Sequence, residues 1–410
     1  PEYMVPSFFV FLDAFPLTAN KKIDVRALPQ PELSGHMAGQ PYVGPRNGME
    51  VQLTALWQQV LGMQEIGIHD NFFDLGGHSL KAAQLFYQLE LVFGKQLPLA
   101  TLFQAPTIAE LAAVLTKASW VPPWQSLVAI QPGGTGVPLF MVPGVGGNVL
   151  VFAKLARILG TEQPLYGLQA RGLDGKETPF TSVPEMAFHY VQEVRRMHPD
   201  GPYLIGGVCT GGLIGYEMAR LLTALGCPVI LFMMDTWHPD SYTRYKNRLV
   251  AKVFMSMIVL GKIIEDIRSI SRLPMQKWWV TLTRKTQVVL SLFSQSLTDH
   301  IQDRDFQVQR LTEATLLAVA RYRVQPTAAQ VVNVVASNRH VDDVIPDTRH
   351  RWQELGAESS CTVHIPAEDS GRLFVSPFVE ELAGHLQNYL QKSPDLAAGV
   401  GMPARNNQSA

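Results

Sequence analysis

Apolar residues recur at helical spacing in a short stretch of the chain, residues 47–118. Spacings of three and four residues are those of amphipathic helices that bury one face. The positions form two groups: Val51, Leu53, Leu56, Trp57, Val60 and Leu61, then Leu80, Ala83, Leu85, Leu89 and Leu91. Four short helices in about 70 residues predict a small helical bundle.

Further along, the pattern changes to continuous apolar runs separated by amphipathic stretches. The runs at 139–142, 203–206, 229–234 and 331–335 are typical of strands buried in a parallel sheet. Helical patterns lie between them, as at 183–197 and 212–225. The alternation predicts an α/β fold, a mostly parallel sheet with helices on both faces.

Stretches rich in proline and small polar residues separate these parts. Within the α/β part, roughly 80 residues show helical patterns and no strand, which predicts an inserted helical lid. The expected parts are a fragment at 1–30, a linker at 31–46, the bundle at 47–118, a linker at 119–127, the α/β domain at 128–392 with its lid at about 241–324, and a disordered tail at 393–410.

Composition excludes several classes of function. The 34 Lys and Arg against 35 Asp and Glu leave a net charge of -1, so no basic excess favours a nucleic-acid partner. The longest apolar stretch, 249–264, contains two lysines and is too short for a membrane span. Three cysteines are too few for a disulfide framework and predict a reducing, cytoplasmic location.

Ser79 follows a pair of glycines where the second helical pattern begins. A serine at this place is a good helix N-cap, which is its simplest interpretation. The whole string 70–80 (DNFFDLGGHSL), however, resembles the phosphopantetheine attachment motif of carrier domains. The resemblance implies 4′-phosphopantetheine bound covalently to Ser79 and a phosphopantetheinyl transferase as a partner. A helix N-terminus also favours the phosphodiester.

Residues 16–24 (PLTANKKID) resemble the closing motif of adenylation domains in nonribosomal peptide synthetases. Lys22 stands where the family has the lysine that contacts the adenylate, and Lys21 replaces a usual glycine. The resemblance implies that 1–30 is the end of an adenylation domain. The chain is then expected to be the C-terminal portion of such a synthetase, with adenylation and condensation domains upstream.

Cys209 lies in the string 206–212 (GGVCTGG), between an apolar run and a helical pattern. Gly-x-nucleophile-x-Gly at a strand–turn–helix is the nucleophile elbow of α/β hydrolases, whose strained turn needs the glycines. The alternative is a buried structural cysteine. Cys227 and Cys361 lack such a context and are expected to be structural.

Three further residues would complete such a site. Asp235 ends the run 229–234, where this fold places the carboxylate that orients the base; the alternative is that it only begins a turn. The oxyanion hole needs the amide after the nucleophile, Thr210, and one from an early loop. That loop is 143–148 (PGVGGN), in which we select the amide of Val145.

From about residue 138 to 390 the chain resembles type I thioesterases, which terminate nonribosomal peptide and polyketide assembly lines. The resemblance implies a thioesterase of α/β-hydrolase fold with a peptidyl thioester as substrate, and no metal. It is carried by the strings YGLQARGLDG at 166–175, GPYLIGG at 201–207 and YEMAR at 216–220.

Two positions depart from that family. Cys209 stands where serine is usual, and Ser370, seven residues before Pro377, stands where the family has the catalytic histidine. His238 and His340 are candidates for a relocated base, although a loop histidine is more often simply solvated. His364, on the expected last strand, is expected to be structural.

The two departures are chemically compatible. A thiol ionises near pH ~8.5, and lower at a helix N-terminus, so it can attack without the base that a serine needs. Water, in contrast, is a poor nucleophile without a base. We therefore expect release by an internal amine or hydroxyl of the peptidyl chain, giving a cyclic product such as a strained lactam or lactone.

Other interpretations remain at this stage. The thioesterase domain could release a linear acid, act as a proofreading hydrolase, or serve as a catalytically impaired docking module. A cysteine introduced in place of serine to trap an acyl-enzyme would also give this sequence.

Overall fold

The computed structural model describes residues 42–95, 97–117, 126–174, 176–241, 301–338 and 361–392, with isolated positions such as Arg349 and Trp352. Lys21, Lys22, His340, the tail and most of the expected lid lie outside the described residues. The chain divides into two compact units, one formed mainly by residues up to 124 and the other mainly by later ones. Within the described ranges, no helix is long and apolar enough to cross a lipid bilayer.

The first unit is the predicted helical bundle. Its core contains the fully buried rings of Trp57 and Phe72, which meet edge to face with centroids 5.2 Å apart. Val51 and Leu91, counted in the apolar pattern, are instead 53% and 59% exposed, because a helix buries only one stripe of its surface. The helices are α1 (Gly48–Leu61), α2 (Ser79–Phe93), α3 (Thr101–Gln104) and α4 (Ile108–Thr116).

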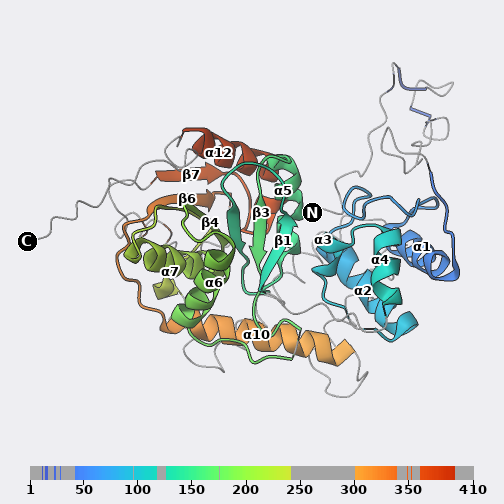
Figure 1. Cartoon of the computed structure of the whole chain (residues 1–410). Coiled ribbons are helices and arrows are strands. Elements are labelled where there is room, and N and C mark those ends of the chain that lie inside the picture. Colours follow the sequence, from blue (N-terminus) through green and yellow to red (C-terminus); the bar gives the residue numbers. More distant parts are fainter. Residues whose placement is uncertain are drawn as a thin grey trace, which may run out of the picture. The chain divides into compact units, whose positions relative to one another are not determined.

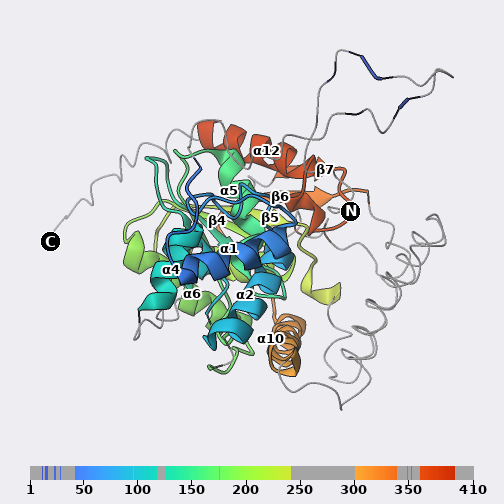
Figure 2. The same ribbon diagram turned by 90° about the vertical axis from the view of Figure 1, so that its right-hand side faces the viewer.

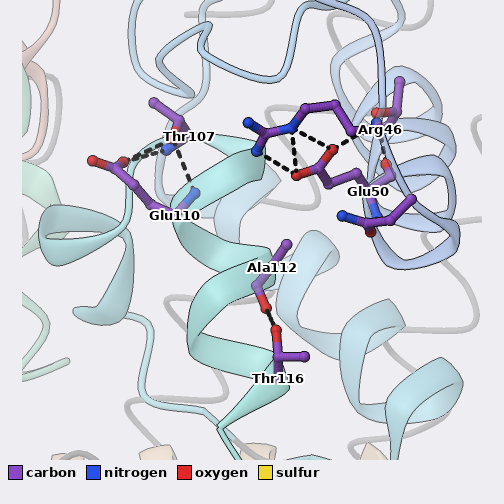
Figure 3. Close-up of polar contacts among 8 residues, drawn as sticks. Arg46, Glu50, Thr107, Glu110, Ala112 and Thr116 are labelled. Atoms are coloured by element: carbon purple, nitrogen blue, oxygen red, sulfur yellow. Dashed lines mark hydrogen bonds and ion pairs between the residues drawn. The ribbon is translucent and has the colours of Figure 1, made fainter.

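Side chains satisfy the free amides at the starts of two of these helices (Figure 3). In α1, the Asn47 side chain accepts a hydrogen bond from the Glu50 N–H at 2.9 Å. The Arg46 guanidinium pairs with Glu50 at 2.7 Å and lowers the pKa of that buried carboxyl. In α4, Thr107 and Glu110 form a reciprocal capping box. Local sequence signals therefore fix where α1 and α4 begin.

The second unit is built on a seven-stranded sheet with strand order β1-β3-β2-β4-β5-β6-β7. In this spatial order, each strand from β3 onward is parallel to the next one, as predicted. The strands are β1 (Leu127–Gln131), β2 (Leu139–Val142), β3 (Leu165–Leu168), β4 (Tyr203–Val208), β5 (Val229–Met234), β6 (Gln330–Ala336) and β7 (Cys361–Ile365).

Helices cover both faces of this sheet (Figures 1 and 2). Leu231 and Met233 of β5 belong to the core shared with α6 and α7, whereas the ring of Phe232 between them contacts Tyr389 of α12 on the other face. The helices are η2 (Val149–Phe152), α5 (Ala153–Leu159), α6 (Val183–Met197), α7 (Thr210–Ala224), α10 (Ile301–Arg321), η6 (Arg372–Phe374) and α12 (Phe378–Lys392).

A buried polar cluster ties α7 to the chain just after α10. The Tyr322 hydroxyl donates to Glu217 of α7 at 2.8 Å, and Arg220 pairs with the same carboxylate at 2.6 Å. Burial, the largest cause, and the neighbouring carboxylate both raise the pKa of Tyr322. The cluster therefore attaches the residue that follows α10 to α7. Helix α10 itself belongs to the predicted lid segment.

Replacing Thr107 with alanine should destabilise α4 by about 1 kcal/mol, because the capping box is lost. Hydrogen exchange of α4 amides in the whole chain should accelerate about fivefold. The matched control is Thr116→Ala at the other end of α4, where the hydroxyl only donates to the Ala112 carbonyl of the same helix. Equal acceleration in both variants would contradict the prediction.

Candidate active site

Cys209 occupies a sharp turn between β4 and α7, as the sequence predicts. Its backbone has φ 53° and ψ -121°, a positive φ that is strained for a residue with a side chain. The Cys209 N–H donates to the Met234 carbonyl at 2.9 Å, and the Gly212 N–H donates to the Cys209 carbonyl at 3.1 Å. These bonds hold the half-buried thiol at the N-terminus of α7.

The glycines around Cys209 allow close approach to two neighbouring segments. A Cβ on Gly211 would lie 2.4 Å from the Pro143 carbonyl oxygen, after β2. A Cβ on Gly212 would lie 1.8 Å from Thr236 Oγ1, after β5. Neither contact is physically possible, so glycine is required for the first turn of α7 to pack between the ends of β2 and β5.

The two amides predicted for the oxyanion hole belong to the start of α7 and to the loop after β2. Thr210, fully buried, is the first residue of α7. A Cβ on Gly144 would lie 3.5 Å from the Cys209 Cβ, so the 143–148 loop passes beside the cysteine. Val145 is the next residue of that loop. The role of both amides stays a prediction.

Asp235 lies at the corresponding position on the neighbouring strand. Val208 and Met234 are register partners on β4 and β5, so Cys209 and Asp235 each follow the last residue of adjacent strands. Asp235 is 1% exposed and also has a positive φ, 50°. Its N–H donates to the Val334 carbonyl at 2.6 Å.

Asp235 forms an ion pair with Arg349, a residue that no sequence pattern indicated. Arg349 Nη1 lies 2.6 Å from Asp235 Oδ1, and the guanidinium also donates to the Ala336 carbonyl at 2.7 Å. Arg349 is itself 3% exposed. The residue stands between β6 and β7, 114 positions from Asp235, in a stretch with no periodic pattern to mark it.

Of the two candidate bases, His238 lies among the described residues and His340 does not. His238 is buried, with Nδ1 3.3 Å from Asp240 Oδ2 and its ring 5.3 Å from that of Trp352. Ser370 lies in the turn after β7, and His364 is an exposed residue of β7. The position where the related enzymes have histidine is therefore occupied by a half-buried serine of this turn.

A small cavity begins at the loop beside Cys209. Its volume is about 20 Å³, room for a single water molecule. Most of its wall is apolar. The lining residues include Gly144 after β2, Ala170 after β3, Tyr190 of α6, Ile214 of α7 and Leu311 of α10.

In the helical bundle, Ser79 is the first residue of α2 and its side chain is exposed. His78, at the N-cap, makes no side-chain hydrogen bond to the helix amides. A Cβ on Gly77 would lie 2.3 Å from the Phe72 ring, so glycine is needed where the loop meets the core. An accessible hydroxyl at a helix start without a side-chain cap suits a phosphodiester.

Comparison with known proteins gives two family matches. Residues 51–115 match the phosphopantetheine attachment site, and residues 137–307 match the thioesterase domain. Together these describe a carrier domain and an α/β-hydrolase thioesterase.

The relatives are large synthetases. Over 239 residues the chain is 43% identical to malpinin synthetase of Mortierella alpina, covering 58% of this chain and 3% of that protein. Over 247 residues it is 38% identical to a dimodular nonribosomal peptide synthase of Bacillus subtilis, covering 60% of this chain and 10% of that protein. The chain thus spans a small part of these relatives.

Among solved structures, the chain is similar to a four-domain nonribosomal peptide synthetase bound to AMP and glycine. The TM-score is 0.50 at 27% identity, covering 94% of this chain and 29% of the other. With the attachment motif, the nucleophile elbow and the two family matches, this makes the chain a carrier–thioesterase portion of a nonribosomal peptide synthetase.

Proposed function

We propose that this portion of the synthetase takes a peptidyl chain onto Cys209 as a thioester and releases it by intramolecular cyclisation. The observation that carries the proposal is the strained turn that presents the Cys209 thiol at the start of α7. Thiols at helix N-termini ionise more readily, because the N-terminal amides favour negative charge.

Ser79 is the proposed attachment residue for the prosthetic arm, because its hydroxyl is exposed at the start of α2. When bound there, phosphopantetheine supplies the thiol that carries the peptidyl chain as a thioester. A phosphopantetheinyl transferase and upstream domains of the synthetase are the expected partners.

The first step is a thioester exchange at Cys209. The Cys209 thiolate attacks the carbonyl carbon of the peptidyl thioester, a new C–S bond forms, and the original C–S bond breaks to release a thiolate. The amides of Thr210 and Val145 would stabilise the oxyanion of the tetrahedral intermediate. Because one thioester replaces another, the acyl group stays activated.

The second step is release from Cys209. An amine or hydroxyl of the bound chain attacks the carbonyl, and the departing Cys209 thiolate takes up its proton. Hydrolysis would need a base to activate water, and Ser370 stands where the family has the catalytic histidine. This replacement supports cyclisation over hydrolysis.

Cys209→Ala should abolish the acyl-enzyme, and Cys209→Ser should slow release at least about 100-fold, because an alcohol needs a general base. The measurement is intact-protein mass spectrometry and product formation with a soluble peptidyl N-acetylcysteamine thioester. Circular dichroism controls for folding. Full activity of the serine variant would show that a base is present and would contradict the proposed mechanism.

Product analysis tests cyclisation directly. With the native peptidyl chain loaded on the carrier, we expect mainly cyclic product by liquid chromatography and mass spectrometry. Mainly linear acid would overturn cyclisation, and acid release from many unrelated short acyl thioesters would indicate a proofreading hydrolase. Absence of any adduct on Cys209 would indicate a docking module.

Ser79→Ala should abolish loading by a phosphopantetheinyl transferase, seen as loss of the corresponding mass increase. The same variant should keep its activity toward the soluble thioester, because that substrate does not need the arm. Thr101→Ala, in the same bundle, is a control that retains Ser79. Loading of the Ser79→Ala variant would contradict the assignment.

A further inference from the structure

A serine and a histidine outside the nucleophile elbow form a hydrogen bond within the second unit. Ser126 Oγ lies 2.8 Å from His189 Nε2. Ser126, 4% exposed, directly precedes β1, and His189 is a half-buried residue of α6. The bond therefore joins the start of the first strand to a helix 63 residues further along the chain.

Both partners are also held by other contacts. The Ser126 carbonyl accepts a hydrogen bond at 2.8 Å from the N–H of Gln169, the residue after β3. The His189 ring packs against the rings of Phe180 and Tyr190, with centroids 5.4 and 5.7 Å apart. These contacts hold the imidazole where its Nε2 meets the Ser126 hydroxyl.

Ser126 stands where the chain enters the second unit. The described part of the helical bundle ends at Lys117, and residues 118–125 join it to Ser126. The length of a tether sets the effective concentration of the group that it delivers, and a tether longer than the span it must cross lowers that concentration. The attachment of Ser126 therefore decides where the segment between carrier and thioesterase ends.

Burial and four charged side chains act on the His189 ring. Burial is the largest cause and lowers the pKa of His189. Glu193 of α6 and Glu177, from the loop after β3, raise this pKa, while Arg171 of that loop and Arg196 of α6 lower it. Because the net shift is downward, the neutral ring is the form that suits this place.

We propose that Ser126 and His189 form a pH-sensitive anchor, which attaches the end of the carrier linker to α6 while the His189 ring is neutral and loosens when the ring takes up a proton. The proposal does not depend on the role of Cys209.

The direction of the pH dependence follows from the burial of the ring. A solvated histidine takes up a proton near pH ~6.5, whereas the anchored ring resists protonation because its pKa is lowered. Below that pH the released ring binds a proton that the anchored ring does not, which favours release. The anchor is therefore at full strength above pH ~6.5 and weakens as the pH falls below it.

The test is amide hydrogen exchange of the full chain at about pH 7.5 and about pH 5.5, corrected for the intrinsic effect of pH on exchange. The reporter is the Gln169 N–H, whose acceptor is the Ser126 carbonyl. Wild type is compared with Ser126→Ala, which removes the hydroxyl, and with His189→Gln, whose amide can bond to that hydroxyl but does not titrate. Helix α12, which packs on the other face of the sheet, is the internal control.

In wild type, the Gln169 amide should exchange about threefold faster at the lower pH. Ser126→Ala should accelerate this exchange about tenfold at the higher pH, because a buried hydrogen bond is lost. His189→Gln should stay within about threefold of wild type at the higher pH and should lose the dependence on pH. The α12 amides should exchange equally in all three proteins.

A Gln169 amide as well protected in Ser126→Ala as in wild type would overturn the anchor. Wild-type pH dependence in His189→Gln would overturn the role of His189 protonation. Equal acceleration of the Gln169 and α12 amides in Ser126→Ala would also contradict the proposal, since the bond would then stabilise the whole unit rather than the end of the linker.

Discussion

The site depends on one backbone constraint, the close packing of the first turn of α7 between the ends of β2 and β5. Gly211 and Gly212 come so near to Pro143 and Thr236 that a side chain on either would overlap them. This packing forces Cys209 into a positive φ. Strain of this kind persists only where the surrounding structure over-determines it, and here a parallel sheet buried on both faces provides that rigidity.

The two departures from the family are consistent with each other. A serine nucleophile needs a general base, whereas a thiol ionises near neutral pH and depends on a base much less. Cysteine at 209 and serine at 370 are therefore compatible: the nucleophile that needs a base least stands in the chain that lacks the usual histidine.

Much of the fold was predictable, because buried strands and amphipathic helices leave continuous patterns. The helical stretch 183–197 has the bounds of α6, and the apolar run 229–234 those of β5. β1 and β3 were missed as strands. β1 lies at the edge of the sheet with one buried residue of five, and a glycine interrupts β3, whose sequence is LYGL, so neither shows a distinct apolar run. The elbow was predictable from local glycines, but the ion pair of Arg349 with Asp235 was not, since it joins residues 114 positions apart.

The proposed acyl link to Cys209 also bears on the energy available for ring closure. A thioester keeps the activation of the incoming chain, while an ester on serine would lose part of it. That stored energy is useful only if water does not consume it first, and water is a poor nucleophile without a base. Under the proposed mechanism, slow hydrolysis and a reactive acyl link therefore favour the same outcome, attack on the carbonyl by an internal nucleophile of the bound chain.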